Sequence, residues 1–198
     1  MKPPRQRETN AEATRALIIA KARKVFAKRG FADAGLAEIV TAAKVTTGAV
    51  YHHFGDKKGL FLAVAETVER DILRGVRLAA ATKSGPWDQL LAGVDATLEI
   101  CAEPDVQRIV FIDAPTVIGP AAWREIELKY AFGGMRTALR GLIEAGVIRP
   151  GSADMLASIL LGALIEAARA VARAGDKRAA MVDARATVAR LFTSLRTG

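Results

Sequence analysis

An all-α fold is predicted by three features of this 198-residue sequence. Apolar residues recur at helical spacing along most of the chain, and no stretch shows the alternation of a strand. Glycine and proline separate the helical stretches, with prolines at positions 104, 115, 120 and 150 as clear breaks. We therefore predict a small three-helix domain at the N-terminus, followed by a larger helical domain.

The chain opens with a segment, residues 1–13, that we expect to be a disordered basic arm. Its first ten residues, MKPPRQRETN, hold two prolines and three basic side chains and offer little to bury. From Thr14 the pattern becomes helical, and Gly30 supplies a stop. The apolar face of this first helix consists of Leu17, Ile18, Ala22, Val25 and Phe26.

Two short helices joined by a tight turn are expected next. The first covers about 35–43, and the turn falls at 44–45. The second begins at Thr46, whose hydroxyl can cap it, and ends near Phe54. Since this arrangement is a helix-turn-helix, we predict a DNA-binding domain over residues 14–60.

The rest of the chain, residues 61–198, is predicted to form one helical domain that binds an effector and dimerises. Asp56 can cap a long helix that reaches about Thr82 and leads into this domain. The glycine pair 133–134 suggests a kink inside a predicted helix. Further helices fit residues 87–102, 104–112, 120–146, 153–174 and 177–196.

The basic charge is concentrated in the first third of the chain. The net charge is +8, and residues 1–60, with 12 basic and 5 acidic side chains, carry +7 of it. A polyanion such as nucleic acid suits that asymmetry, because neutralised phosphates release counterions. Membrane lipid and simple solubility are the competing explanations.

A cytoplasmic location is expected from three further features. The single cysteine, Cys101, cannot form an internal disulfide, and the N-terminus lacks the apolar core of a secretory signal. The longest strongly apolar stretch, 155–165, is shorter than the roughly 20 residues that cross a bilayer. We therefore expect no membrane partner.

The second helix of the helix-turn-helix has the side chains of a recognition helix. Hydroxyls and free backbone N–H groups at its start can meet phosphate or a base edge, although Thr46 also suits a plain cap. Tyr51 can bind phosphate or be half-buried, and Lys57 at the positive end of the next helix suits a nearby phosphate. His52 and His53 are adjacent in sequence and point in different directions on a helix, so no metal site is expected. The candidate DNA-binding residues are Lys44, Thr46, Thr47, Gly48, Tyr51, His52, His53 and Lys57.

These motifs resemble the TetR family of bacterial transcription regulators over about residues 15–62. The matching positions are Phe26, Gly30, Phe31, Gly48, Val50, Tyr51, His53, Phe54, Lys57 and Leu60. The resemblance implies a homodimer in which Thr47, Gly48 and His52 approach bases, while Tyr51, His53 and Lys57 hold the phosphate backbone. Two positions depart from the family pattern: Ala34 and Gly35 replace a hydroxyl residue, and Lys44 replaces a glycine in the turn.

The last two predicted helices are expected to pair with their copies in a four-helix dimer interface, because both are rich in apolar residues. The alternative is that the same residues form the internal core of a monomer. In the dimer, two recognition helices about 34–36 Å apart would read successive major grooves of a palindrome. The predicted interface residues are Leu156, Leu160, Leu164, Val188, Phe192 and Leu195.

The region between residues 87 and 135 supplies aromatic and polar side chains for a small-molecule pocket. For each residue alone, packing or exposure is the commoner role. The predicted ligand-binding residues are Trp87, Arg108, Phe111, Asp113, Trp123, Glu127 and Tyr130.

These expectations combine into a ligand-responsive transcriptional repressor that binds a palindromic operator and is released by an inducer. The alternative is a constitutive or architectural DNA-binding protein without a ligand, and activation in place of repression stays open. An enzyme is disfavoured, because no nucleophile–base or metal-ligand spacing is present. No cofactor and no metal are expected.

Overall fold

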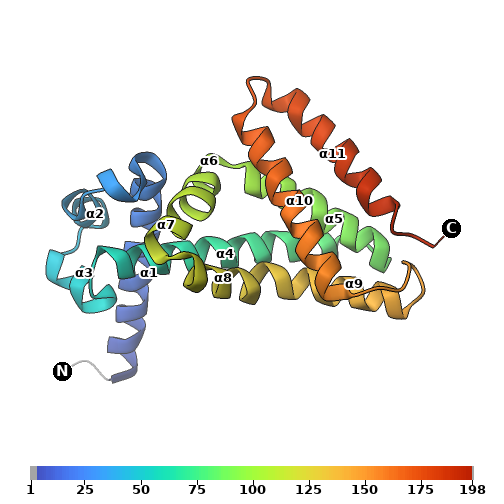
Figure 1. The fold of residues 1–198 in the computed structure, drawn as a ribbon. Helices are drawn as coiled ribbons and strands as arrows, with labels where there is room; N and C mark the ends of the chain where they lie inside the picture. The colour runs from blue at the N-terminus through green and yellow to red at the C-terminus, as the bar shows by residue number, and fades with distance from the viewer. Residues whose placement is uncertain (1–3, 198) are drawn as a thin grey trace.

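The computed structural model describes residues 4–197, and every regular element in that range is a helix (Figure 1). One isolated antiparallel bridge joins Ile148 to Arg196. The all-α prediction is therefore confirmed. Most predicted helices are present with ends within a few residues of their expected positions.

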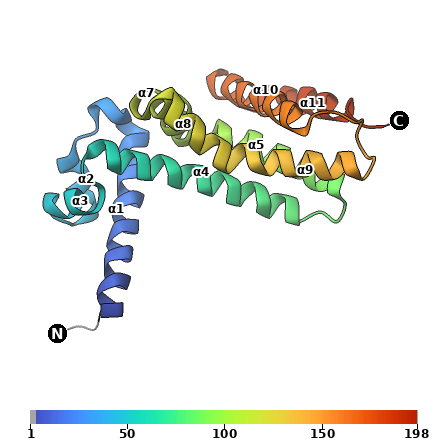
Figure 2. The same ribbon diagram turned by 60° about the horizontal axis from the view of Figure 1, so that its bottom comes forward.

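The N-terminal part consists of α1 (Pro4–Asp33), α2 (Leu36–Ala43) and α3 (Thr47–Phe54). The predicted disordered arm is wrong for residues 4–13, which form the start of α1; its first three residues lie outside the described range. Proline is tolerated in the first turn of a helix, and the alanines and glutamate that follow at 11–13 favour continuation of it. Local composition alone therefore misled the prediction. Figure 2 shows this end of α1 extending away from the rest of the molecule.

Gly30 interrupts α1 as the sequence predicted. Its backbone is non-helical, with φ 75° and ψ 170°, a conformation that side chains with a Cβ rarely adopt. A Cβ here would also overlap the guanidinium of Arg108. The backbone angle therefore requires glycine, whereas the flexible Arg108 guanidinium would only have to move aside for a Cβ.

The turn between α2 and α3 has a left-handed residue that is not glycine. Lys44 caps α2 with φ 53° and ψ 43°, and its N–H donates back to the carbonyls of Thr41 and Val40. The left-handed conformation costs a residue with a Cβ roughly 1–2 kcal/mol. The turn keeps the geometry that usually favours glycine, so this cost is present in the native state.

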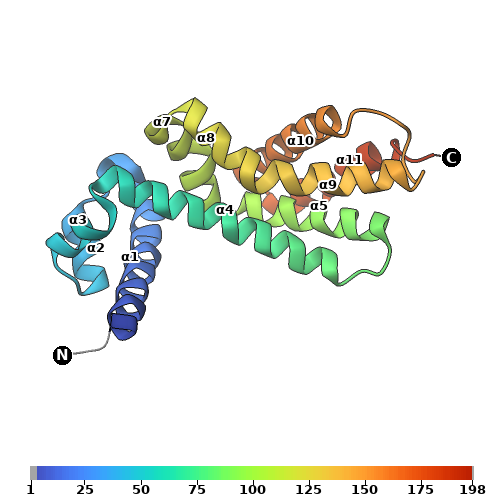
Figure 3. The same ribbon diagram turned by 90° about the horizontal axis from the view of Figure 1, so that it is seen from below.

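The long helix α4 (Lys57–Ala81) connects the two halves of the molecule. Asp56 caps it as predicted, with its Oδ1 accepting from the Gly59 N–H at 2.6 Å. Helix α5 (Pro86–Ala102) follows after a short loop and packs back along α4 (Figure 3).

The middle of the chain departs from the predicted breaks. Helical turns continue from Pro104 through α6 (Pro104–Val106), the π-helix η1 (Gln107–Asp113) and α7 (Ala114–Ile118). Pro115 does not end this run: it follows the π-helix η1 directly, and the helical backbone continues past it to Ile118. The predicted break therefore moves to Gly119, whose φ is 101°.

The predicted helix over 120–146 comprises three segments. These are α8 (Pro120–Glu127), the π-helix η2 (Leu128–Phe132) and α9 (Gly133–Glu144). Gly133 itself is regular, with φ −59° and ψ −40°. The irregularity therefore lies in the turn before the glycine pair.

The chain ends with α10 (Ala153–Arg173) and α11 (Lys177–Thr193), which pack against each other (Figure 2). Helix α10 is long and apolar enough to cross a bilayer, with 28% of its most apolar window buried. Length and composition alone do not separate such a span from a core helix. Here α10 also packs against α5 and α9, which makes it the central helix of this half.

Two apolar clusters hold the fold together. The first joins α1, α2 and α3 to α4, η1 and α8, and the rings of Phe26, Phe31 and Phe61 meet inside it at centroid distances of 5.1–6.0 Å. The second joins α5, α9, α10 and α11. The predicted boundary at residue 60 therefore falls inside α4 and inside the first cluster.

Glu69 on α4 is the one charged residue that is buried in the described part of the chain, with 5% of its surface exposed. Burial, and to a smaller extent the nearby Glu127 carboxylate, raise the pKa of Glu69 from 4.5 to about 7. The thiol of Cys101 lies close by, and burial and the charge of Glu69 raise its pKa to about 12. This thiol is therefore protonated near neutral pH.

Lys44→Gly is expected to raise the free energy of unfolding by about 1 kcal/mol, because glycine removes the left-handed strain. Urea unfolding followed by circular dichroism measures the change. Lys44→Ala is the matched control, since it removes the charge but keeps the strain. Equal stabilities of the two variants would contradict the prediction.

Glu69→Gln is expected to change how stability depends on pH. Because the folded state holds the Glu69 proton more tightly than the unfolded state, the wild type loses stability as pH rises from about 4.5 to about 7. The difference in unfolding free energy between the Glu69→Gln variant and the wild type should grow by about 2 kcal/mol from about pH 5 to about pH 8.

Urea unfolding at the two pH values measures this difference. The exposed Glu125, which forms no ion pair among the described residues, provides the control variant Glu125→Gln. A pH-independent difference for Glu69→Gln would show that this carboxyl titrates normally in the folded protein.

Candidate nucleic-acid interface and effector cavity

Helix α3 is anchored on one side and free on the other. Val50 is fully buried, and the Thr46 hydroxyl accepts from the Ala49 N–H at 3.2 Å, which confirms the predicted cap. The exposed residues of the helix are Thr47, Gly48, Tyr51 and His52. Four of the predicted DNA-binding residues therefore share one free surface.

Gly48 has no internal reason to be glycine. A Cβ at this position would meet only the Thr46 hydroxyl, at an ordinary 3.9 Å. Its backbone does not need positive φ either. Nothing inside the protomer therefore requires glycine at this position.

The remaining predicted residues lie around this surface. Lys44 is exposed beside the start of α3, and His53 is half-buried with its ring 5.3 Å from the His52 ring. Lys57 is half-buried: its Nζ donates to the Ala32 carbonyl at 3.2 Å and lies 4.7 Å from the Phe31 ring centroid. Lys57 therefore has internal contacts as well as a place beside the surface.

Helix α2 lacks a side-chain cap, as the sequence suggested. Gly35 is its N-cap residue and makes no side-chain hydrogen bond. Among the described residues, no three or more His, Cys, Asp or Glu side chains gather as metal ligands.

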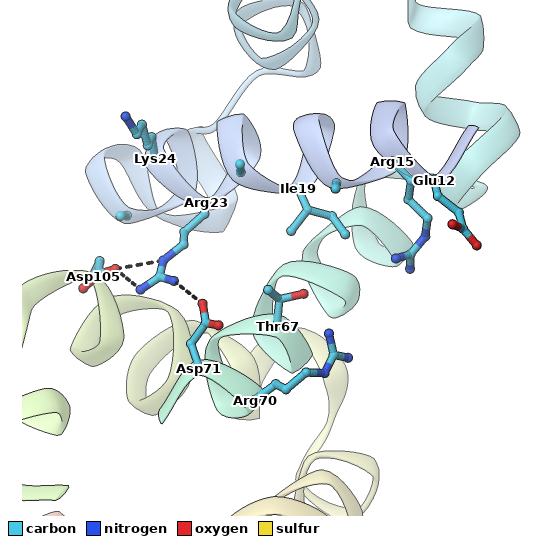
Figure 4. Close-up of a pocket in the computed structure, with 12 residues that line it drawn as sticks. Glu12, Arg15, Ile19, Arg23, Lys24, Thr67, Arg70, Asp71 and Asp105 are labelled. Carbon is cyan, nitrogen blue, oxygen red and sulfur yellow. Dashed lines mark hydrogen bonds and ion pairs between the residues drawn. The ribbon is translucent and has the colours of Figure 1, made fainter. Parts of the chain in front are cut away.

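One ion-pair cluster ties α1 to the helices behind it (Figure 4). The Arg23 guanidinium donates to Asp105 at 2.6 and 2.9 Å and to Asp71 at 3.0 Å. Asp71 lies on α4 and Asp105 on α6, so Arg23 joins three helices. It borders a groove of about 630 Å³ between α1 and α4.

A second polar connection lies at the end of α1. The Asp113 carboxylate accepts from the Phe31 N–H at 2.8 Å and from Arg108 Nε at 3.3 Å. Two residues of the predicted ligand pocket, Arg108 and Asp113, thus join η1 to the end of α1. The sequence prediction of ligand contact needs correction for both.

A cavity of about 910 Å³ lies between α4, α5, η2, α9 and α10. Phe111, Glu127 and Tyr130 line it, as expected for the predicted pocket. Trp87 and Trp123 do not: Trp87 packs on the second apolar cluster beside Arg196, and Trp123 is buried in the first. The prediction is wrong for both tryptophans. Their direction is decided by tertiary packing against the apolar clusters, which the sequence alone does not show.

Charge is distributed unevenly around this cavity. Glu69 lines it from α4 and makes no hydrogen bond or ion pair with any described residue. The cations at its edge are exposed, and most pair with carboxylates. These pairs are Arg124–Glu127 at 3.4 Å, Lys129–Glu66 at 2.9 Å and Arg136–Asp154 at 3.6 Å, while Arg77 forms no ion pair in the described range.

The predicted dimer residues lie mostly inside the protomer. Leu160, Leu164, Val188 and Phe192 are each at most 5% exposed and belong to the second apolar cluster. They cannot also form a surface, so the prediction is wrong for these four. Leu156 and Leu195 are partly buried against the same cluster.

A different set of apolar side chains on these two helices is exposed. On α10, Met155 and Ile159 are 61% and 58% exposed; on α11, Val182 and Leu191 are 60% and 39% exposed. Helical periodicity identified apolar helices but could not decide which of two apolar faces points inward.

Sequence reasoning missed Glu69 and Arg23. A signal for Glu69 was available, because a charge interrupts the apolar stripe of α4 between Ala65 and Ile72. No local signal marked Arg23, whose partners Asp71 and Asp105 are 48 and 82 residues away in sequence.

Two sequence profiles match the chain. Residues 18–64 match "Bacterial regulatory proteins, tetR family", and residues 87–195 match "Tetracyclin repressor-like, C-terminal domain". The first match covers α2 and α3, including the exposed residues Thr47, Gly48, Tyr51 and His52, here called the candidate recognition surface. The second covers most of the helices that form the cavity, together with the exposed apolar face.

Relatives and solved structures agree with these matches. A TetR-family regulator from Pectobacterium atrosepticum is 35% identical, with a TM-score of 0.79 over 96% of this chain and 97% of that one. The repressor BepR of Brucella suis is 36% identical over 53% of this chain, which is about half of BepR's length. The activator FasR of Mycolicibacterium smegmatis is 34% identical over 49% of this chain and 45% of FasR. The chain therefore belongs to the TetR family of DNA-binding transcriptional regulators.

Proposed function

We propose that this protein is a ligand-responsive repressor that binds a palindromic operator as a dimer and is released by a small molecule. The observation that carries the proposal is one helix, α4, that begins beside the recognition surface and continues along the wall of a 910 Å³ cavity. A regulator needs both a DNA-reading surface and a sensor, and α4 links them mechanically.

DNA contact is assigned to the free surface of α3 and its borders. Thr47, Gly48 and His52 would approach base edges, and Gly48 suits close approach because it has no side chain to separate its backbone from the DNA. Tyr51, His53 and Lys57 would hold phosphates, with Thr46 and Lys44 at the edge. Only the exposed part of the Lys57 side chain is available, since it also contacts Phe31.

Dimerisation is assigned to the exposed apolar side chains of α10 and α11. Apolar surface of this kind is typical of a protein interface. Met155, Ile159, Val182 and Leu191 would form it, with Leu156 and Leu195 at the border. The interface lies on the side of the molecule far from α3 (Figure 1), so it would set the separation of the two recognition helices.

The ligand response would pass through α4 and the polar contacts of α1. A ligand shifts the equilibrium between two conformations only when it binds one of them more tightly. Filling the cavity would favour one position of α4, and the Arg23 and Asp113 contacts would move α1 with it. The DNA-binding part, residues 14–60, and the effector-binding part, residues 61–198, would thus move together.

A constitutive DNA-binding role is the second candidate, and a cavity of this size argues against it. Whether bound protein represses or activates depends on the operator's place relative to a promoter. BepR is named a repressor and FasR an activator, so both outcomes occur among relatives. We propose a non-enzymatic, cytoplasmic regulator that requires no cofactor.

Tyr51→Phe is expected to weaken operator binding about tenfold, because it removes a phosphate hydrogen bond but keeps the ring. Fluorescence anisotropy with fragments of the protein's genomic neighbourhood measures the affinity. The slope of log affinity against log salt should stay at the wild-type value, because the neutral tyrosine hydroxyl releases no counterion from the phosphate.

Two further variants separate specific from general binding. His52→Ala should relax sequence preference, whereas Lys83→Ala, just beyond the far end of α4, should change nothing. Sequence-independent binding by the wild type would favour an architectural role. No binding by the wild type would refute the assignment of this surface.

Ile159→Lys is expected to convert the dimer to a folded monomer, because a charge in an apolar interface is left unpaired. Sedimentation equilibrium measures the dissociation constant, which should rise at least about tenfold. Leu78→Lys is the matched control, since Leu78 is 66% exposed on α4. An unchanged dimer in Ile159→Lys would place the interface elsewhere.

A further inference from the structure

The wall of the effector cavity holds one buried charge without a partner. Glu69 is 5% exposed, lines the cavity from α4, and forms no hydrogen bond or ion pair within the described residues. An unpaired carboxylate in such a place destabilises the protein, because its charge has lost most of its water without gaining a compensating group. A polar group from a ligand would remove that penalty.

The groups that face Glu69 do not supply the missing charge. Glu127 lies near enough to disfavour ionisation of Glu69, and burial and this neighbour raise the pKa of Glu69 to about 7. Cys101, on the α5 side, is a neutral thiol whose pKa is raised to about 12. The surroundings of Glu69 are therefore acidic or neutral.

The cations of the cavity lie at its edge. Arg124, Lys129 and Arg136 have side chains that are 54%, 62% and 42% exposed, and each is within 4 Å of a carboxylate. Arg77 also lines the cavity, but it is solvent-exposed and forms no ion pair in the described range. An acidic ligand would have to compete with carboxylates at the first three cations, and at Arg77 it would meet a charge that water already solvates. A basic ligand, in contrast, would find its opposite charge already buried.

Most of the rest of the wall is apolar, with Gln89, Thr97, Thr137 and Ser158 as its uncharged polar side chains. Ile72 and Leu73 line it beside Glu69, Phe111 and Phe132 line it from the π-helices, and Leu161 lines it from α10. The volume of about 910 Å³ is larger than a single amine group needs. The site thus combines a large apolar space with one buried acid.

We propose that the cavity binds an amphiphilic cation, an apolar molecule with a protonated amine whose charge is met by Glu69 and supported by Glu127. The inference rests on the proposed function, because it names the class of ligand for the same cavity. Charge-assisted hydrogen bonds between an ammonium group and a carboxylate are among the stronger polar contacts.

Three probes with the same chain and different head groups test the proposal: decylamine, decanol and decanoate. Isothermal titration calorimetry at about pH 8, below the micelle concentrations, measures their dissociation constants. At this pH the amine is protonated and most Glu69 is ionised. Wild type should bind decylamine at least about tenfold more tightly than either other probe.

Glu69→Gln is the decisive variant, because it removes the charge and keeps the shape. It should weaken decylamine binding about tenfold while leaving decanol within about threefold. Glu125→Gln, on the same helix as Glu127 but outside the cavity wall, should behave as wild type. Thermal unfolding of each variant verifies that it is folded.

The outcomes separate this inference from the proposed function. If decanol or decanoate binds most tightly and releases operator DNA, the cavity is a ligand site and only the cationic class is overturned. Unchanged decylamine binding in the Glu69→Gln variant also overturns the proposal that the ligand is a cation. If none of the three probes binds or releases operator DNA, the ligand response itself is refuted together with the inference.

Discussion

Helix α4 contributes one long apolar stripe, interrupted by Glu69, to both halves of the molecule, and most of the architecture depends on that sharing. Leu60, Phe61 and Val64 close the first apolar cluster under the recognition surface. Further along, Ile72, Leu73 and Val76 form part of the cavity wall. A helix of 25 residues cannot bend freely without breaking its own hydrogen bonds, so a displacement at one end also moves the other.

Polar contacts make the attachment of α1 to this helix specific. Apolar packing tolerates small shifts, whereas the Arg23 contacts with Asp71 and Asp105 have defined distances and directions. Asp113 adds a contact to the backbone of Phe31, just after the left-handed Gly30. The position of the recognition helix therefore depends on groups far from it in sequence.

Sequence predicted the helices better than their surroundings, for a physical reason. Caps such as Thr46 and Asp56 act within four residues, and helical periodicity acts within a few turns, so both are visible locally. The family motif likewise pointed to the exposed residues of α3, which we propose as the DNA contact. The partners of Arg23, the tryptophans outside the cavity and the inward direction of Leu160 depend on tertiary packing. Composition alone also failed at residues 4–13, where local helix propensity prevailed.

In the proposed dimer, the two faces of α10 would give folding and dimerisation separate surfaces. Because Leu160 and Leu164 complete the core within one chain, while Met155 and Ile159 stay outside it, a protomer does not need a partner to bury its own centre. Monomer and dimer would then exchange by mass action. For an operator that accepts only the dimer, occupancy at low protein levels would rise with the square of the protomer concentration. Such a regulator would respond to its own abundance more sharply than a monomeric one.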